Sequence, residues 1–196
     1  QLLNKAEFAH SRIQETVEGY LQSLESLAKA MTRNDHYLEP KKALQLLKFF
    51  YIFDDDLKLL PVTWHPLGDS NKSFSTFGIE TAESDEDLLK QLKQKPHQVI
   101  IYDQPSILSD FNLIIVFPVL KQSKHRDSTN ENILIGYLKA SIKAPQILQT
   151  LYDNLSADNL LKITRQKDNA VIYFAKQETR QHNPFKVVSY PSLENY

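Results

Sequence analysis

The sequence predicts an α+β protein with a long N-terminal helix, an antiparallel sheet of five strands and a smaller sheet module near the C-terminus. Apolar residues recur at helical spacing over residues 1–33, and short apolar runs bounded by polar turns follow. A strand-turn-strand pattern also occurs twice, at residues 49–62 and 160–174. This repetition suggests two related modules, each entered by a helix.

The composition is that of a folded globular chain. Of the 196 residues, 41% are hydrophobic, which is enough for a packed core. The 23 basic and 24 acidic residues almost cancel, and this balance argues against a nucleic-acid partner. Disulfides and thiolate metal sites are excluded because the chain has no cysteine. Both ends look cut, as expected of a piece of a larger protein.

Residues 1–33 predict one amphipathic helix, which would be about 45 Å long. Its apolar stripe consists of Ala6, Ile13, Val17, Tyr20, Leu24, Leu27 and Met31. Two interpretations fit this pattern. The helix is either a spine or dimer seam that serves more than one module, or an ordinary helix whose stripe packs in a local core.

The segment after this helix predicts a second helix and the first strand pair. Pro40 is a favoured first helical residue, and the helix is expected over residues 41–48. Residues 49–53 and 58–62 then read as two strands joined by the acidic turn at residues 54–56. Residues 66–82 are polar and predict a loop with a short strand around residues 74–79.

A short helix should follow this loop. Ser84 has the character of an N-cap, with Asp87 three residues later. Leu88, Leu89 and Leu92 would form the apolar side of this helix.

Three strong strands come next, at residues 98–103, 113–120 and 133–142. The middle strand is continuously apolar, which predicts burial on both faces. In the third strand Tyr137 and Lys139 share one face, opposite Leu138. A polar hairpin loop is expected over residues 121–132.

The C-terminal part predicts a helix from Pro145 to Leu155, the second strand pair, a polar loop over residues 177–183 and a strand over residues 185–190. Three parts are therefore expected. These are the long helix (1–33), a first sheet module (34–145), and a connecting helix with a partial second module (146–196).

This order of helices and strands is that of PAS-like sensor modules, and the chain resembles the double Cache family of tandem PAS-like receptor domains. Residues 52–60 are similar to the family's first hairpin. Residues 116–142, with Gly136 near the start of the second strand, are similar to its pair of long strands. Residues 187–196 are similar to the turn before its last strand, and the second module would lack that final strand.

The resemblance implies the extracytoplasmic, periplasmic part of a membrane-anchored bacterial receptor. The output domain would lie outside this chain, in a diguanylate cyclase, histidine kinase or chemoreceptor. The domain itself would bind a small molecule without being an enzyme and without a cofactor. An alternative is a non-sensing module for dimerisation through the N-terminal helix or for binding another protein.

In this family the ligand lies in the first module, against the sheet. The matching positions are Trp64, His65, Tyr102, Asp103, Phe117, Tyr137 and Lys139. Lys139 and Asp103 at an aromatic-lined cavity would suit a small carboxylate or zwitterion. The alternative interpretation is that Tyr137 and Lys139 line an exposed sheet face and that Asp103 begins a turn.

No motif predicts catalysis or a metal site. His125, Arg126 and Asp127 match the spacing of a kinase catalytic loop, but the other kinase motifs are missing from the sequence. The six histidines are scattered and form no short-spaced ligand pair. The acidic run at residues 54–56 lacks the Gly and distal Glu of a calcium loop.

Overall fold

The computed structural model describes residues 2–33, 39–68, 72–76, 78–81, 85–106, 110–122, 132–143, 146–147, 161–164 and 171–175. The helices within these ranges are α1 (Leu2–Thr32), α2 (Pro40–Phe53), α3 (Asp55–Leu59) and α4 (Glu86–Gln94). The strands are β1 (Val62–Pro66), β2 (Lys72–Ser75), β3 (Gly78–Thr81), β4 (Ile100–Ser106), β5 (Asp110–Gln122), β6 (Asn132–Lys143), β7 (Leu161–Thr164) and β8 (Val171–Ala175).

The fold is α+β, as the sequence predicts, with a long N-terminal helix and an antiparallel sheet. The main sheet has the strand order β3-β2-β1-β6-β5-β4. It contains six strands instead of five, because the segment expected to be mostly loop adds the hairpin of β2 and β3 while the expected strand at residues 49–53 is helical. Gly78 opens β3 with φ +149°, a backbone conformation that favours glycine.

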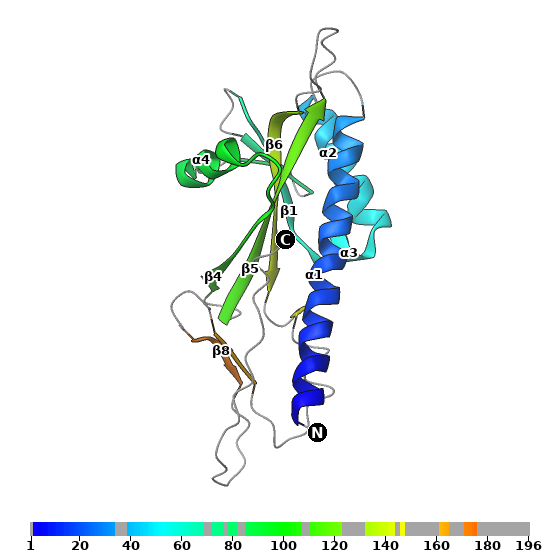
Figure 1. Ribbon diagram of the computed structural model, residues 1–196. Helices are drawn as coiled ribbons and strands as arrows, with labels where there is room; N and C mark the ends of the chain where they lie inside the picture. The colour runs from blue at the N-terminus through cyan, green and yellow to red at the C-terminus, as the bar shows by residue number, and fades with distance from the viewer. Residues whose placement is uncertain are drawn as a thin grey trace. The chain divides into compact units, whose positions relative to one another are not determined.

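The chain divides into two compact units. Residues 1–18, 102–113 and 142–196 form one, and residues 19–101 and 114–141 form the other. In the second unit, α2, α3 and the C-terminal part of α1 lie on one side of the sheet, and α4 lies on the other (Figure 1). The division into three parts at residues 34 and 146 stays a prediction.

The stripe of α1 belongs to the protein's own core. Tyr20, Leu24, Leu27 and Met31 are all buried, so this part of the helix fits the interpretation of a local core. Burial of each such side chain stabilises the fold by about 1.5–3 kcal/mol. The middle strand of the sequence prediction, β5, buries the consecutive residues Ile114, Ile115 and Val116, which confirms burial on both faces.

The first predicted strand pair is wrong. Residues 49–53 continue α2, and residues 55–59 form α3. Ala43 and Leu47 are buried four residues apart on α2, and Phe50, three residues after Leu47, is half-buried. The second copy of the pattern does form a strand pair, β7 with β8. The apparent repeat is therefore not a structural repeat.

Asp54 explains why the chain stays helical on both sides of the acidic turn. Its backbone is extended, and its N–H donates to the carbonyl of Phe50 at the end of α2. Its side-chain oxygen accepts a hydrogen bond of 3.2 Å from the backbone N–H of Leu57 in α3. One residue thus ends one helix and caps the next.

The N-cap of α4 is Asp85, not Ser84, which lies outside the described residues. The side chain of Asp85 accepts a hydrogen bond of 3.0 Å from the N–H of Leu88. Ser and Asp are both favoured at this position, so the sequence alone does not choose between them. Leu88 and Leu92 are buried as expected, and Leu89 is half-buried.

The strands expected at 98–103, 113–120 and 133–142 are present as β4, β5 and β6. β5 and β6 extend beyond both predicted ends, and β4 begins and ends later than predicted. Of the helix expected from Pro145 to Leu155, only residues 146–147 are described, and they are helical. Most of the loop at 121–132, and both the loop at 177–183 and the strand at 185–190, lie outside the described residues. Among the helices that the structure describes, none combines the length and apolar character needed to cross a bilayer.

Candidate functional site

Polar and aromatic side chains gather on one face of the central strands β1 and β6. The antiparallel register places Thr63 opposite Lys139 and His65 opposite Tyr137. Directly opposed residues point to the same side of a sheet, as do residues two apart along a strand. These four side chains therefore form one surface, which we call the β1–β6 polar face.

Strand β2 extends this face. Ser75 lies opposite Thr63 on the neighbouring strand, and Ser73 lies two residues from Ser75 on the same side. Both serines are buried, and Ser75 donates to the carbonyl of Gly78 at 3.4 Å. Small hydroxyl side chains thus lie beside the larger ones of the β1–β6 polar face.

The His65 ring is held in one orientation. It stacks on the Tyr137 ring with 4.6 Å between centroids and 4° between planes. Its Nε2 lies 2.9 Å from the Thr63 hydroxyl, which donates to the backbone carbonyl of Lys139 at 3.3 Å. Because that hydroxyl has a single proton, we assign the proton of the ring to Nε2, which leaves Nδ1 as an acceptor.

The charges on this face come from Lys139. Burial, and secondly the positive charge of Lys139, lower the pKa of His65 from its usual 6.5 to about 4. The imidazole is therefore neutral near pH 7, and Lys139 is the cationic member of the β1–β6 polar face. A neutral imidazole, a stacked phenol and an ammonium group can together hold a small anion with a polar or flat body.

Trp64 lies on the other face of β1. It is 2% exposed and opposes Leu138 and Phe74 in the register. A Cβ at Gly136 would overlap the Trp64 indole and come within 2.5 Å of the carbonyl oxygen of His65. Glycine at position 136 therefore lets the indole lie across β6, which supports the strand carrying Tyr137 and Lys139.

The structure brings together three of the seven predicted site residues, namely His65, Tyr137 and Lys139. Phe117 is half-buried on β5, the other neighbour of β6. Tyr102 and Asp103 are half-buried on the edge strand β4, with β5 between β4 and β6. Successive residues of a regular strand point to opposite faces, so Tyr102 and Asp103 are not expected to share one.

Sequence reasoning did not select Thr63, Ser73 or Ser75. The signal for Thr63 was its place between Val62 and Trp64, since alternation puts it on the face of His65. The serines lie in the segment expected to be mostly loop, with Ser75 in its expected short strand around residues 74–79. Ser73 and Ser75 lie beside β1 because β2 pairs with β1. The spacing of apolar residues within one segment does not predict which strand it pairs with.

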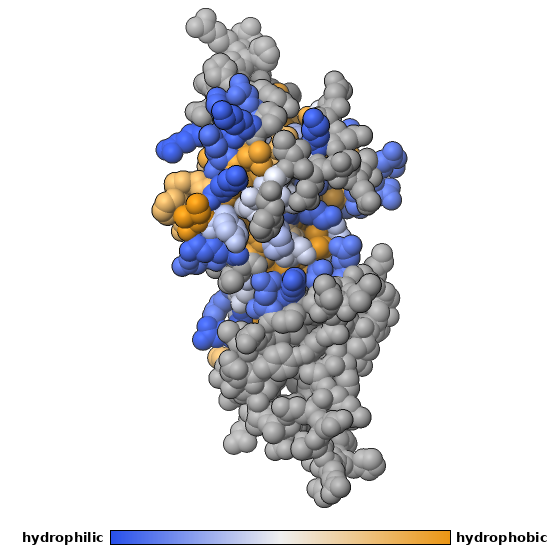
Figure 2. Space-filling model, turned by 180° about the vertical axis from the view of Figure 1, so that it is seen from behind, coloured by the Kyte–Doolittle hydropathy of each residue, from blue (hydrophilic) through white to orange (hydrophobic). Residues whose placement is uncertain are grey.

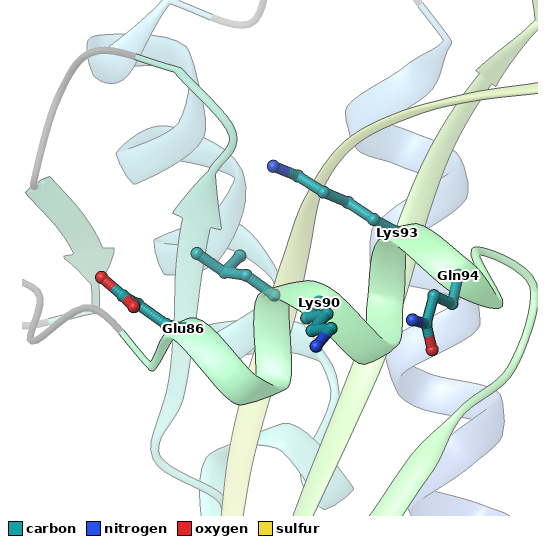
Figure 3. A pocket seen from close by; sticks show the side chains of 5 residues that line it. Glu86, Lys90, Lys93 and Gln94 are labelled. Atoms are coloured by element: carbon teal, nitrogen blue, oxygen red, sulfur yellow. The ribbon is translucent and has the colours of Figure 1, made fainter.

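A separate hollow of about 400 Å³ lies along α4 (Figure 3). Its described lining consists of Glu86, Leu89, Lys90, Lys93 and Gln94, all on one face of this helix. Lys90 and Lys93 are exposed to solvent. Among the residues described here, no group of three or more His, Asp or Glu side chains could hold a metal ion.

No known family matches the chain, and no curated protein is significantly similar to it in sequence.

Proposed function

We propose that the chain is the extracytoplasmic ligand-sensing domain of a bacterial signal-transduction receptor. The receptor would be a diguanylate cyclase, histidine kinase or chemoreceptor, and its sensor would be of the double Cache type. The observation that carries this proposal is the β1–β6 polar face, where His65, Tyr137 and Lys139 lie together near the middle of the sheet.

An antiparallel sheet with helices on both sides, the arrangement expected of a PAS-like module, is consistent with the proposal. At the centre of this sheet β1 pairs with β6 over five residue pairs. Helices lie on both sides of this sheet (Figure 1). The small sheet of β7 and β8 is the described part of what would be the second module.

The chemistry of the face suits a small carboxylate. Lys139 would pair with the carboxylate, and His65 Nδ1 would accept from a hydroxyl or amide of the ligand. Among the four side chains of the β1–β6 polar face, Lys139 is the charged one near pH 7.

A route from the sheet toward α1 is available through the α2–α3 junction. Ser23 of α1 donates to the Asp54 side chain at 3.1 Å, and α2 and α3 precede β1 directly. A ligand that binds one arrangement of these helices more tightly than another would shift their equilibrium. The parent receptor would read this shift through α1.

Thermal denaturation with a panel of short-chain mono- and dicarboxylic acids tests the proposal. A ligand at a hundred times its Kd should add about 2.7 kcal/mol to the free energy of unfolding. For a chain of this length that is about 5–11 °C in Tm. Lys139→Gln should abolish the shift, whereas Lys143→Gln, at an exposed position of the same strand, should keep it. If a ligand raised the Tm of both variants equally, Lys139 would not be part of the site.

The second candidate function is an interaction module without a small ligand. It is favoured by an exposed apolar surface on α2, which is independent of the β1–β6 polar face.

A further inference from the structure

The C-terminal half of α2 exposes large apolar side chains. Phe49, Ile52 and Phe53, spaced three and four residues apart on one side of the helix, are 53%, 58% and 70% exposed. The rings of Phe49 and Phe53 lie 4.7 Å apart. We call these three side chains the α2 apolar surface. Figure 2 shows hydrophobic atoms gathered at the edge of the molecule that α2 and α3 form.

This surface is separate from the side of α2 that packs in the core. Ala43 and Leu47 are buried on that other side. From the exposed fractions and about 200 Å² for a large apolar side chain, the α2 apolar surface covers roughly 350 Å². Contiguous apolar patches of this size on a monomer are often functional, and commonly mark an interaction site.

Opposite charges flank the α2 apolar surface along the chain. Lys48 immediately precedes it and is exposed. Asp55 follows it at the start of α3, with its side chain 93% exposed, and pairs with Lys58 at 2.6 Å. The segment therefore runs from a basic residue through apolar residues to an acidic residue. Two such segments in antiparallel arrangement would place opposite charges beside each other.

We propose that the α2 apolar surface binds a second copy of this chain in a symmetric, antiparallel arrangement. A two-fold axis between Tyr51 and Ile52 would place the apolar side chains of the two copies against each other. Lys48 and Asp55 lie equally far from that axis along the sequence. Each Lys48 would then lie level with Asp55 of the second copy, which gives two symmetric ion pairs.

The same features disfavour an anionic membrane as the occupant. Lys48 would be attracted to such a surface, but Asp55 beside Phe53 would be repelled by it. A second copy would give Lys48 a carboxylate partner, which Asp55 could supply while it keeps Lys58. The two surfaces together would bury roughly 700 Å², below the about 1,200 Å² of a standard stable interface. We therefore expect a weak dimer whose population depends on concentration.

Sedimentation equilibrium of the 196-residue chain over a concentration series tests the dimer. The apparent mass should rise above 22.7 kDa with concentration. Phe53→Glu should raise the dimer Kd at least about tenfold, because it buries a charge at the centre of the interface. Ile133→Glu, at a residue 54% exposed on β6, is the matched control and should leave the Kd unchanged. Circular dichroism should show that both variants keep the fold.

Charge exchange tests the geometry. Lys48→Glu and Asp55→Lys should each weaken self-association by about 5- to 30-fold, because two pairs change from attraction to repulsion. An equimolar mixture of the two variants should associate again, since both pairs are then opposite in sign. A chain that stays monomeric at all concentrations would overturn the proposal. The proposal would also be overturned if the Phe53→Glu variant associated as tightly as the wild type, or if the mixture failed to associate. Binding of the wild type to anionic vesicles that Phe53→Glu abolishes would overturn it as well.

Discussion

At the scale of single residues, the site depends on small side chains as much as on large ones. Gly136 has no Cβ, so the Trp64 indole can lie across β6 at this position. Thr63 orients the His65 ring through its hydroxyl. Gly136 and Thr63 thus position the larger side chains that would bind a ligand.

Gly136→Ala should destabilise the protein. The added methyl group would overlap the Trp64 ring and the His65 carbonyl, and overpacking of this kind costs about 1–3 kcal/mol. We expect Tm to fall by roughly 3–10 °C. Gly68→Ala is the control, because a Cβ there would meet no atom within 4 Å. Equal Tm values for the two variants would contradict the packing described here.

His65 should make the stability depend on pH in the acid range. The unfolded chain takes up a proton at His65 near pH 6.5, while the folded chain does so only near about 4. Between these values the unfolded state holds more protons, so the free energy of unfolding falls as pH drops, by at most about 1.4 kcal/mol per unit. Above pH 6.5 this contribution does not vary with pH.

The variant His65→Gln isolates this effect. Chemical denaturation at a series of pH values should show a shallower loss of stability below pH 6.5 for His65→Gln than for the wild type. His97→Gln, at an exposed position, should retain the wild-type slope. An unchanged slope in His65→Gln would mean that the ring is not buried as described.

At the scale of elements, the sequence predicted those whose pattern is long or unambiguous. The apolar stripe of α1 extends over many turns, and the apolar run of β5 is too continuous for a half-exposed strand. The apolar pattern of residues 49–53 predicts a strand, but a short apolar segment is compatible with a helix as well as a strand. Its helical nature is set by the buried Ala43 and Leu47 before it and by Asp54 after it.

The candidate site was predictable only in part. Alternation along β6 is enough to place Tyr137 and Lys139 on one face of the strand. The partner strand was not predictable in the same way, because β1 is separated from β6 by many residues and their register depends on the whole sheet. That register is what sets Thr63 against Lys139 and His65 against Tyr137.

At the scale of the whole molecule, the buried stripe of α1 changes how dimerisation should be tested. Leu24 and Leu27 are fully buried in the protein's own core, so polar variants there would unfold the protein without testing any interface. The α2 apolar surface is exposed and can be changed while the fold is kept. Ligand binding at the β1–β6 polar face and self-association through α2 are thus separable by variants.

The central claim is that the β1–β6 polar face binds a small carboxylate. Nuclear magnetic resonance of the histidine side chains, with each short-chain carboxylic acid titrated in turn, tests it most directly. At least one acid should move the His65 signals saturably and raise the pKa of His65 above about 4, because its charge offsets that of Lys139. The signals of the exposed His97 should stay in place. If no acid moves His65, or if His65 and His97 move alike without saturation, the claim is wrong.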